Sequence, residues 1–338
     1  MRPFIYQPVS TMKTAVQAGA YAPAADASGA VHFLAGGTTL LDLMKLDVTR
    51  PGKVVDINAL ATGPAGRIKA DEQGLRLGGL VRMSEAAEHP EIRRGYPVIA
   101  QSLQLAASQQ IRNMASLGGN VLQRTRCPYF RDVSYPECNK RNPGTGCAAM
   151  DGFNRMHAVL GVSKNCIATY PGDFANALIA LDAVVDIIGT HGNRRIPFAA
   201  LHRRPGKTPE IETTLLPGDM IVSFFIPAAA CTRRSLYLKV RDRESYEFAL
   251  VSVAVALDLH RGRARDVRIA LGGVATVPWR ATRAEATLKG RVIDERAMAD
   301  AARSAFAGAR RREHNAFKIA LGRRALIRAL GQAMAMEV

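Results

Sequence analysis

The sequence predicts an α+β protein, in which a part that mixes helices and strands is followed by a sheet with its own helices. Two observations predict this class: strand-like and helix-like segments alternate near the N-terminus, and a run of strands after residue 217 gives way to helices. The chain of 338 residues is 48% apolar and 22% charged, which is enough for two or three domains. This composition excludes a disordered tail, a collagen-like rod and a small disulfide scaffold.

The first elements are predicted from short apolar runs between turn residues. Buried strands are expected at Val31–Leu34 and Lys53–Asp56, and the segment between them, Thr38–Lys45, has helical periodicity. Asp173 precedes an apolar helix at Phe174–Leu181. It is placed as the N-cap of that helix, because a carboxylate there can accept a hydrogen bond from a free backbone N–H.

The remaining elements separate into strands and then helices. Strands are predicted at Ala183–Ile188, Met220–Ile226, Ser235–Val240, Phe248–Leu257 and Val267–Leu271. Helices are predicted at Pro97–Ala107, Thr282–Leu288, Asp294–Phe306 and Asn315–Ala333. The turn residues in Leu216-Pro217-Gly218 predict a domain boundary near residue 217.

A glycine pair in residues 35–39 (AGGTT) is the first candidate binding feature, and a second pair occurs in residues 116–121 (SLGGNV). Glycines at the junction of a strand and a helix leave backbone N–H groups exposed beside the positive end of the helix, which suits a pyrophosphate. A tight turn that needs glycine only for its dihedral angles is the alternative. No GxGxxG fingerprint follows, so a Rossmann nucleotide site is not supported.

Basic residues outnumber acidic ones by 46 to 29, which gives a formal net charge of +17. Such a charge first suggests partners rich in phosphate. The lysines and arginines are nevertheless spread through residues 194–207, 233–268 and 303–328, with few aromatic residues between them for base stacking. We therefore expect no nucleic-acid binding, and we interpret the basic surface as solvated or facing an acidic partner subunit.

Cysteines are concentrated in one stretch of the chain. Four of the five lie there, Cys127, Cys138, Cys147 and Cys166, whereas Cys231 stands apart and is expected to be an ordinary buried thiol. Residues 124–155 lack periodicity and are rich in Pro, Gly, Asn and Arg, so a long loop is predicted. An iron–sulfur cluster, zinc or disulfides could constrain such a loop, and free thiols are a further alternative. No CxxC pair is present, so the usual zinc-ribbon spacing is missing.

Four motifs in this order resemble one family. They are residues 34–41 (LAGGTTLL), 111–120 (IRNMASLGGN), 171–175 (PGDFA) and 237–241 (YLKVR). The chain resembles, nearly end to end, the FAD-binding medium subunit of the molybdenum hydroxylases, the xanthine dehydrogenase and carbon monoxide dehydrogenase family. Within that family it is most similar to the FAD and iron–sulfur subunit of bacterial heterotrimeric aldehyde oxidoreductases.

This resemblance implies a vanillyl-alcohol-oxidase-type (PCMH-type) FAD-binding fold with two α/β lobes, followed by a three-stranded antiparallel sheet with a helix bundle. The expected domains are residues 1–58, residues 59–217 with an inserted cysteine loop at about 124–166, and residues 218–338. FAD is expected to lie in an extended pose between the first two lobes.

The resemblance also implies which residues contact FAD. They are Leu34, Ala35, Gly36, Gly37, Thr38, Thr39, Leu40, Leu41, Ala107, Ser116, Gly118, Gly119, Asn120, Asp173, Ile221 and Lys239. The two glycine loops would cradle the pyrophosphate with backbone N–H groups. Asp173 would accept hydrogen bonds from FAD and Ile221 would pack on its ring system. Lys239 would stabilise the anionic reduced flavin, unless it is a lysine at a strand edge in water.

The cysteine loop departs from the plain xanthine dehydrogenase pattern, in which the second glycine motif leads almost directly to the aspartate. In the aldehyde oxidoreductase branch the loop holds a [4Fe–4S] cluster. The resemblance thus implies four cluster ligands, Cys127, Cys138, Cys147 and Cys166. Neighbouring basic residues would stabilise the cluster's negative charge or form a solvated or subunit-facing surface; they are Arg124, Arg126, Arg131, Lys140 and Arg141.

As implied by the resemblance, the chain is an oxidoreductase subunit that carries no catalytic residues itself, because nothing in it resembles a molybdopterin site. A large molybdopterin-binding subunit would oxidise an aldehyde, and a small subunit with two [2Fe–2S] clusters would relay electrons to FAD. An external acceptor would receive them. The alternatives are a self-contained FAD oxidase, the FAD subunit of a hydroxylase for xanthine or aromatic substrates, and a basic iron–sulfur protein that binds nucleic acid.

The N-terminus has neither an apolar signal segment nor a twin arginine. The longest apolar stretch, Phe248–Leu257, falls well short of the roughly 20 residues that cross a bilayer. We therefore expect no membrane insertion. The expected location is the cytoplasm, or the periplasm by co-export with a partner that carries the signal.

Overall fold

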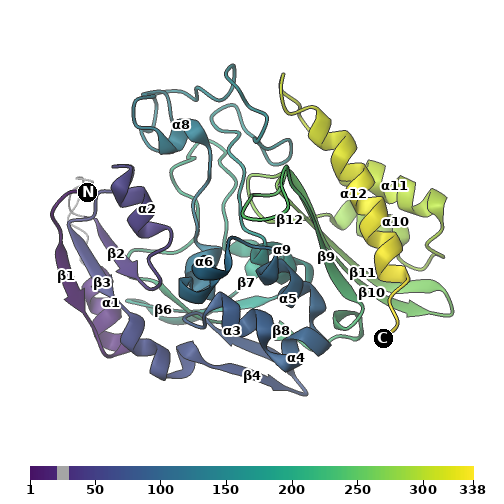
Figure 1. Cartoon of the computed structure of the whole chain (residues 1–338), viewed down its shortest axis with the longest axis horizontal. Helices are drawn as coiled ribbons and strands as arrows, with labels where there is room; N and C mark the ends of the chain where they lie inside the picture. Colours follow the sequence, from purple (N-terminus) through teal and green to yellow (C-terminus); the bar gives the residue numbers. More distant parts are fainter. Residues whose placement is uncertain (21–29) are drawn as a thin grey trace.

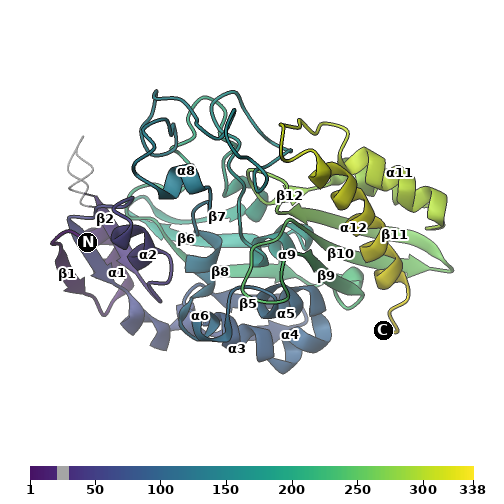
Figure 2. The ribbon, with the colours of Figure 1, turned by 45° about the horizontal axis from the view of Figure 1, so that its top comes forward.

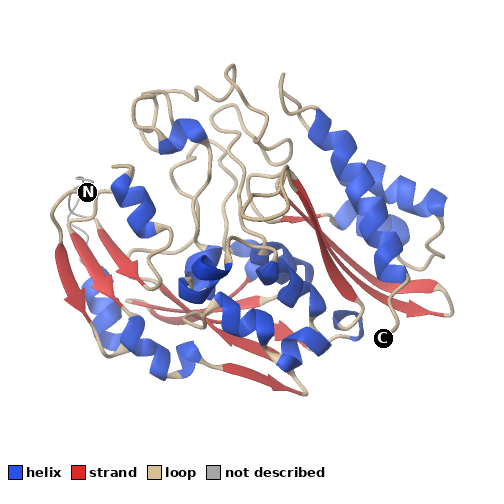
Figure 3. Cartoon of the chain, in the orientation of Figure 1, coloured by secondary structure: helices blue, strands red, loops and turns tan. Residues whose placement is uncertain are grey.

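Three β-sheets and the helices packed on them make up the computed structural model, which describes residues 1–20 and 30–338 (Figure 1). The sheets follow one another along the chain, from the N-terminal part at the left of Figure 1 to the C-terminal helices at the right. Between these ends, a long stretch of loop rises above the helices of the middle part (Figure 3). This arrangement confirms the predicted α+β class.

The first sheet is small and parallel, with the strand order β1-β3-β2. Its elements are β1 (Ile5–Pro8), α1 (Met12–Ala20), β2 (Val31–Leu34), α2 (Leu40–Lys45) and β3 (Lys53–Asp56). Val54 and Val55 are buried because β3 is the central strand. Strands β2 and β3 lie where the sequence predicts them, whereas β1 and α1 are additional.

The second sheet is antiparallel, with the order β4-β5-β8-β6-β7. Its strands are β4 (Ile68–Asp71), β5 (Gly74–Gly78), β6 (Val184–Gly189), β7 (Gly192–Pro197) and β8 (Met220–Pro227). The helices of this part are α3 (Met83–Glu88), α4 (Pro90–Gly95), α5 (Pro97–Gln104), α6 (Gln109–Met114), α7 (Leu117–Val121) and α9 (Phe174–Ala180). Strand β8 follows the boundary predicted near residue 217, yet it pairs with β5 and β6 and therefore belongs to this sheet.

The third sheet is also antiparallel, with the order β12-β11-β10-β9. It comprises β9 (Ser235–Val240), β10 (Val251–His260), β11 (Arg263–Gly272) and β12 (Trp279–Arg280), and is followed by α10 (Thr282–Leu288), α11 (Glu295–Ala305) and α12 (Phe317–Met334). The three expected strands are present, and the two-residue β12 adds a fourth by pairing with β11. Residues 251–257 of β10 are buried because helices α9 and α12 both pack on this strand. Within residues 1–20 and 30–338, no helix combines the length and the apolar character that a membrane span requires.

The cysteine segment, residues 124–166, is almost devoid of regular structure, as predicted. In the part of the chain that the structure describes, its one helix is α8 (Pro128–Arg131). Arg126 and Arg131 donate to Asp42 Oδ2 on α2, at 3.0 and 2.7 Å, so the segment is docked on the N-terminal part. Figures 1 and 2 show it above the middle of the molecule, between α2 and the beginning of α12.

Candidate functional site

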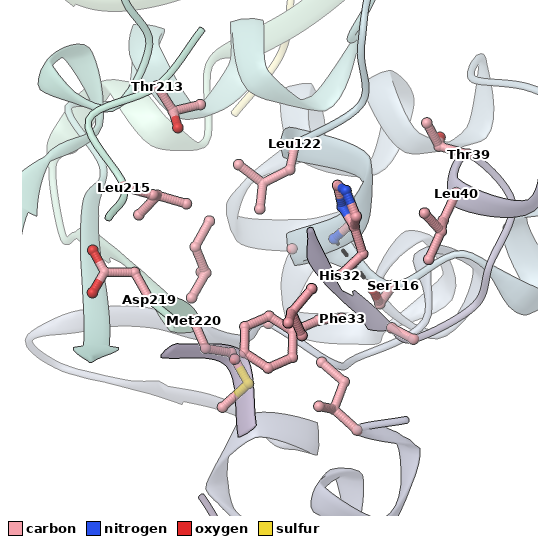
Figure 4. Close-up of a pocket in the computed structure, with 18 of the residues that line it drawn as sticks. His32, Phe33, Thr39, Leu40, Ser116, Leu122, Thr213, Leu215, Asp219 and Met220 are labelled. Atoms are coloured by element: carbon pink, nitrogen blue, oxygen red, sulfur yellow. Dashed lines mark hydrogen bonds between the residues drawn. The ribbon is translucent and has the colours of Figure 1, made fainter. Parts of the chain in front are cut away.

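A groove of about 570 Å³ lies between the first and second sheets. Its walls come from β2, from the loop that leads into α2, from helix α7 and from residues 213–221, which lead into β8. Figure 4 shows side chains from these elements gathered around one space, among them Phe33, Ser116, Leu122 and Met220. Grooves of this size hold large organic ligands.

The two glycine loops predicted from the sequence touch each other at the wall of this groove. A Cβ atom on Gly36 would lie 1.9 Å from the carbonyl oxygen of Met114, so a residue with a side chain cannot occupy this position without separating the loops. Gly37 has φ +70°, in the left-handed region that favours glycine. The first loop therefore needs both glycines to reach the second.

Backbone N–H groups in the first loop lack protein partners, whereas those of residues 117–120 in the second loop all donate within the protein, so the prediction that both loops offer N–H groups is wrong for the second. Among the described residues, no protein acceptor takes the backbone N–H groups of Gly36, Gly37 or Thr38, and the buried Oδ1 of Asn120 receives no hydrogen bond. A Cβ atom on Gly119 would meet only Ser116 Oγ, at 3.0 Å. Unpaired buried polar groups cost free energy. The loops thus fit a ligand that carries acceptor oxygens and hydroxyl donors, as a dinucleotide does.

The groove brings together most of the residues that the sequence predicts to contact FAD. The predicted residues that line it are Ala35, Gly36, Gly37, Thr38, Thr39, Leu40, Ser116, Gly118, Gly119 and Ile221. The predicted residues outside its lining are Leu34, Leu41, Ala107, Asn120, Asp173 and Lys239. Leu34 and Leu41 lie under the first loop, where their Cδ1 atoms would contact a Cβ on Gly37 at 3.1 and 3.0 Å.

Asp173 and Lys239 form a buried ion pair away from the lining of the groove. Lys239 Nζ lies 2.8 Å from Asp173 Oδ2 and 3.0 Å from the carbonyl oxygen of Leu105, and Tyr237 Oη donates to Asp173 Oδ1 at 2.7 Å. The two charged side chains are 1% and 6% exposed. Burial, followed by the charge of Asp173, raises the pKa of Tyr237 well above its ordinary value.

The structure corrects one expectation and one alternative for this pair. Asp173 is the N-cap residue of α9, as predicted, but its side chain makes no capping hydrogen bond, because its backbone is already helical and its carboxylate is engaged by Tyr237 and Lys239. Lys239 is not a solvated lysine at a strand edge, because its side chain is buried against Asp173. Lys239 lies on β9, at the edge of its sheet, but helix α5 packs on that strand.

One wall of the groove has no counterpart among the residues predicted from the sequence; it is formed by Thr213 and residues 215–220, together with His32 and Phe33. The turn residues in Leu216-Pro217-Gly218 predict a domain boundary, but no contact with a ligand. In the structure Gly218 has φ +80° and packs against Ala20 of α1. Burial, and then the charge of Arg124, lowers the pKa of His32 beside this wall. Met220 and Phe33 in Figure 4 show the apolar character of the wall.

The four clustered cysteines line one small cavity, together with Phe130 and Lys140. Ala168 N–H donates to Cys166 Sγ at 3.4 Å, and residues 138 and 147 pair as an isolated β-bridge. Burial raises the pKa of the Cys127 thiol to about 12. Gly144 and Gly146, with φ +88° and +104°, allow the tight turn before Cys147. Cys231 is buried elsewhere, as expected.

Two of the alternatives left open for these cysteines do not match the structure. All five cysteines are free, so no disulfide holds the loop. Within residues 1–20 and 30–338, no group of three His, Cys, Asp or Glu side chains is placed to bind a single metal ion, as tetrahedral zinc requires. A polynuclear cluster, which spreads its ligands around several irons, is compatible with four thiols around one cavity.

A buried imidazole contacts one of these thiols, and the charge of a buried lysine acts on that imidazole. His157 Nε2 lies 3.1 Å from Cys127 Sγ, and burial lowers the pKa of this imidazole to about 4, with a further lowering by the charge of Lys318. Lys318 is fully buried and donates to the carbonyl oxygens of Met156 and Gly273, at 3.0 and 2.7 Å. In the described part of the chain no carboxylate lies within ion-pair distance of Lys318. The region therefore contains a buried lysine without a carboxylate partner.

The basic residues predicted to surround a cluster are mostly paired within the protein. Arg126 and Arg131 bind Asp42, Arg124 and Lys140 bind Glu212, and Arg141 donates to the backbone carbonyls of Tyr129 and Phe130. Of these five, Lys140 lines the cysteine cavity. Lys140, although it is paired with Glu212, is thus the one of these five basic residues placed to face an anionic group in the cavity.

Comparisons with known proteins agree with this architecture. The chain matches the family described as the FAD binding domain in molybdopterin dehydrogenase over residues 3–229, and the CO dehydrogenase flavoprotein C-terminal domain over residues 236–333. It is 45% identical over 337 residues to the aldehyde oxidoreductase FAD-binding subunit PaoB of Escherichia coli, covering 99% of each chain.

Solved structures share the fold across the whole chain. A chain of carbon monoxide dehydrogenase from Hydrogenophaga pseudoflava superimposes with a TM-score of 0.75 at 23% identity, covering 99% of this chain and 98% of that one. A chain of quinoline 2-oxidoreductase from Pseudomonas putida does so with a TM-score of 0.73 at 22% identity, covering 98% and 97%. The predicted resemblance and fold class are confirmed. The chain belongs to the family of FAD-binding subunits of molybdopterin dehydrogenases.

Proposed function

We propose that this chain is the FAD- and [4Fe–4S]-containing electron-transfer subunit of a molybdenum-dependent aldehyde oxidoreductase. The observation that carries the proposal is the groove in which two glycine loops meet, with unpartnered N–H groups along its wall. The full-length similarity to an aldehyde oxidoreductase FAD-binding subunit supports the aldehyde as substrate class. The substrate would be oxidised on a partner, since this chain belongs to a family of FAD-binding subunits.

In this proposal the chain holds FAD and supplies no general acid or base. The N–H groups of Gly36, Gly37 and Thr38 would bind the pyrophosphate. The apolar wall at Phe33 would exclude water from one side of the ligand. FAD supplies the chemistry, because it accepts electrons one or two at a time and passes them on.

The cluster proposal is supported by the chemistry of the cysteine cavity. Four thiols converge there, and a backbone N–H points at one of the sulfur atoms, as is common around cluster ligands. The buried thiol of Cys127 resists ionisation without a metal, because its pKa is raised to about 12. Lys318, whose charge acts on the imidazole of His157 beside Cys127, has no carboxylate partner, and its protonated form would be stabilised by an anionic group.

We further propose the assembly in which this chain works. A large molybdopterin-binding subunit and a small subunit with two [2Fe–2S] clusters would be its partners, and electrons would leave through FAD to an external acceptor. The location would be the cytoplasm or, by co-export, the periplasm. The purified chain alone should contain flavin and oxidise no aldehyde; aldehyde oxidation by the chain alone would contradict the role as a subunit.

Replacing Gly119 by valine is expected to weaken FAD binding by roughly tenfold or more. The new side chain would project into the groove, where little protein opposes its Cβ, so the flavin-free chain should still fold. Flavin content after purification and the dissociation constant from flavin fluorescence measure the effect. Gly331→Val is the matched control, because Gly331 is also helical, has open space around it, and lies on α12 away from the groove. Equal FAD affinity in both variants would refute the proposal that the glycine loops bind FAD in this groove.

Replacing Cys138 by serine is expected to lower iron and acid-labile sulfide to a small fraction of the wild-type content, because serine is a poor ligand for a cluster held by four thiolates. The matched control is Cys231→Ser, which removes another buried thiol but lies outside the cavity. Both variants are analysed for iron, sulfide and flavin. If Cys138→Ser retains as much iron and sulfide as Cys231→Ser while it remains folded, the cluster assignment is wrong.

A further inference from the structure

We propose that Arg82 and Asn58 form a bridge that holds the two glycine loops together and thereby preorganises the FAD cradle. Neither residue belongs to a glycine loop, and neither lines the groove. The inference rests on the proposed assignment of both loops to FAD. It makes Arg82 and Asn58 positioning residues, which act on the ligand through the loops.

Asn58 is the end of the bridge that holds the first loop. Its Nδ2 donates to the carbonyl oxygen of Ala35 at 3.0 Å and to Asp56 Oδ1 at 2.7 Å, and its backbone N–H donates to the same Oδ1 at 2.9 Å. Asp56 is fixed in turn by the hydroxyl of Tyr6 on the neighbouring strand β1. The side-chain amide of Asn58 is therefore held in one orientation, in which its Oδ1 faces Arg82.

Arg82 is the other end and holds the second loop. Its Nη2 donates to Asn58 Oδ1 at 3.0 Å, and its Nη1 donates to the carbonyl oxygen of Met114 at 2.5 Å. The backbone on each side of Arg82 is joined to the same loop: Met83 N–H donates to Ala115 O, and Leu117 N–H donates to Val81 O, both at 2.9 Å. One planar guanidinium thus spans from Asn58 to the loop that begins at Met114.

The carbonyl of Met114 is the point where the bridge and the two loops meet. It accepts from Arg82, and it is also the atom against which Gly36 packs without a side chain. If Arg82 releases this carbonyl, the second loop loses the contact that sets its distance from the first. A ligand that is bound by the N–H groups of the first loop and packs against the second loop requires that distance to be fixed, because hydrogen bonds weaken steeply with poor geometry.

The geometry also explains why an arginine is needed. Arg82 has two parallel donors that reach different acceptors, whereas a lysine offers one compact ammonium group. Within residues 1–20 and 30–338, no carboxylate forms an ion pair with this guanidinium, so its donors are not diverted. The bridge joins residues that are 24 positions apart in the sequence, and a separation of that kind leaves no local sequence signal.

The test measures the FAD dissociation constant of flavin-stripped, full-length chain for Arg82→Met, Asn58→Ala and the double variant. Each single variant should weaken FAD binding about tenfold. The FAD dissociation constant of the double variant should not exceed the larger of the two single-variant values, because both changes break the same bridge. Arg82→Lys should restore part of the affinity through one donor to Met114 O. The control is Arg94→Met, an exposed arginine on α4 that pairs with Glu91.

The thermal midpoint of the flavin-free chain separates positioning from folding. It should be the same for Arg82→Met and Arg94→Met, since the bridge is half-exposed and acts on the loops. Wild-type FAD affinity in Arg82→Met, with flavin lost in Gly119→Val, would overturn the bridge and leave the cradle standing. Additive losses in the double variant, or no gain with lysine, would also overturn it. Retention of flavin in Gly119→Val would contradict the binding of FAD by the glycine loops, and the proposed bridge would then also be wrong.

Discussion

Replacing Lys239 by methionine is expected to lower the free energy of unfolding by about 3–5 kcal/mol, because it leaves the carboxylate of Asp173 buried without its cation. Lys239 Nζ lies 2.8 Å from Asp173 Oδ2, and both side chains are almost completely excluded from solvent. Methionine has a similar length and fills the space, so the loss of charge is the main change. Urea denaturation of the full-length chain measures the effect.

The double variant Lys239→Met/Asp173→Asn isolates the cause. With both charges removed, the asparagine can still accept from Tyr237, and most of the lost stability should return. A surface lysine contributes at most about 1 kcal/mol. A loss of that size in Lys239→Met, or no recovery in the double variant, would contradict a buried ion pair. FAD affinity of the double variant then measures what the charges contribute to the cofactor apart from folding.

The fold could be predicted where apolar residues recur with a clear period. Strand β9 at Ser235–Val240 and helix α10 at Thr282–Leu288 lie where the sequence places them. The strand is a short, mostly apolar run, and the buried Ala284 and Leu288 of α10 are four positions apart, as on one face of a helix. Strand β4 at Ile68–Asp71 was missed, because it lies at the edge of its sheet, is mostly exposed, and so has little apolar signal. Its place in the sheet is fixed by pairing with β5, and the apolar pattern of the residues around β4 does not reveal this pairing.

The residues of the candidate site could be predicted only where a close approach or a positive φ angle of the backbone requires glycine. Gly36, Gly37 and Gly119 were found because a ligand or a second loop must approach the backbone closely. The partners of Asp173 lie 64 and 66 residues away, so no local pattern shows that the carboxylate of this N-cap residue forms an ion pair and makes no capping hydrogen bond. Arg82 had no signal at all, because an arginine before a short helix is compatible with a solvated surface.

A second large effect concerns the buried ammonium of Lys318 and the pH dependence of stability. Burial, and then the charge of Arg155, lowers the pKa of Lys318 from 10.5 to about 7, and Asp242 opposes this shift. The neutral imidazole of His157 faces the same region. Between about pH 7 and 10.5 the unfolded chain therefore binds one more proton at this residue than the folded chain, so the free energy of unfolding rises with pH in that window.

The variant Lys318→Met should lack this rise. Each pH unit corresponds to at most about 1.4 kcal/mol, so between pH 7 and 9 the wild-type chain should gain about 2 kcal/mol relative to the variant, measured by urea denaturation of iron-free protein. The raised pKa of Cys127 acts in the opposite direction, but it is common to both chains and cancels in the difference. An anionic cluster at the four cysteines would keep Lys318 protonated and move the rise to higher pH. The difference should therefore shrink in iron-loaded protein, and an equal difference with and without iron would contradict an electrostatic link between Lys318 and the cysteine cavity.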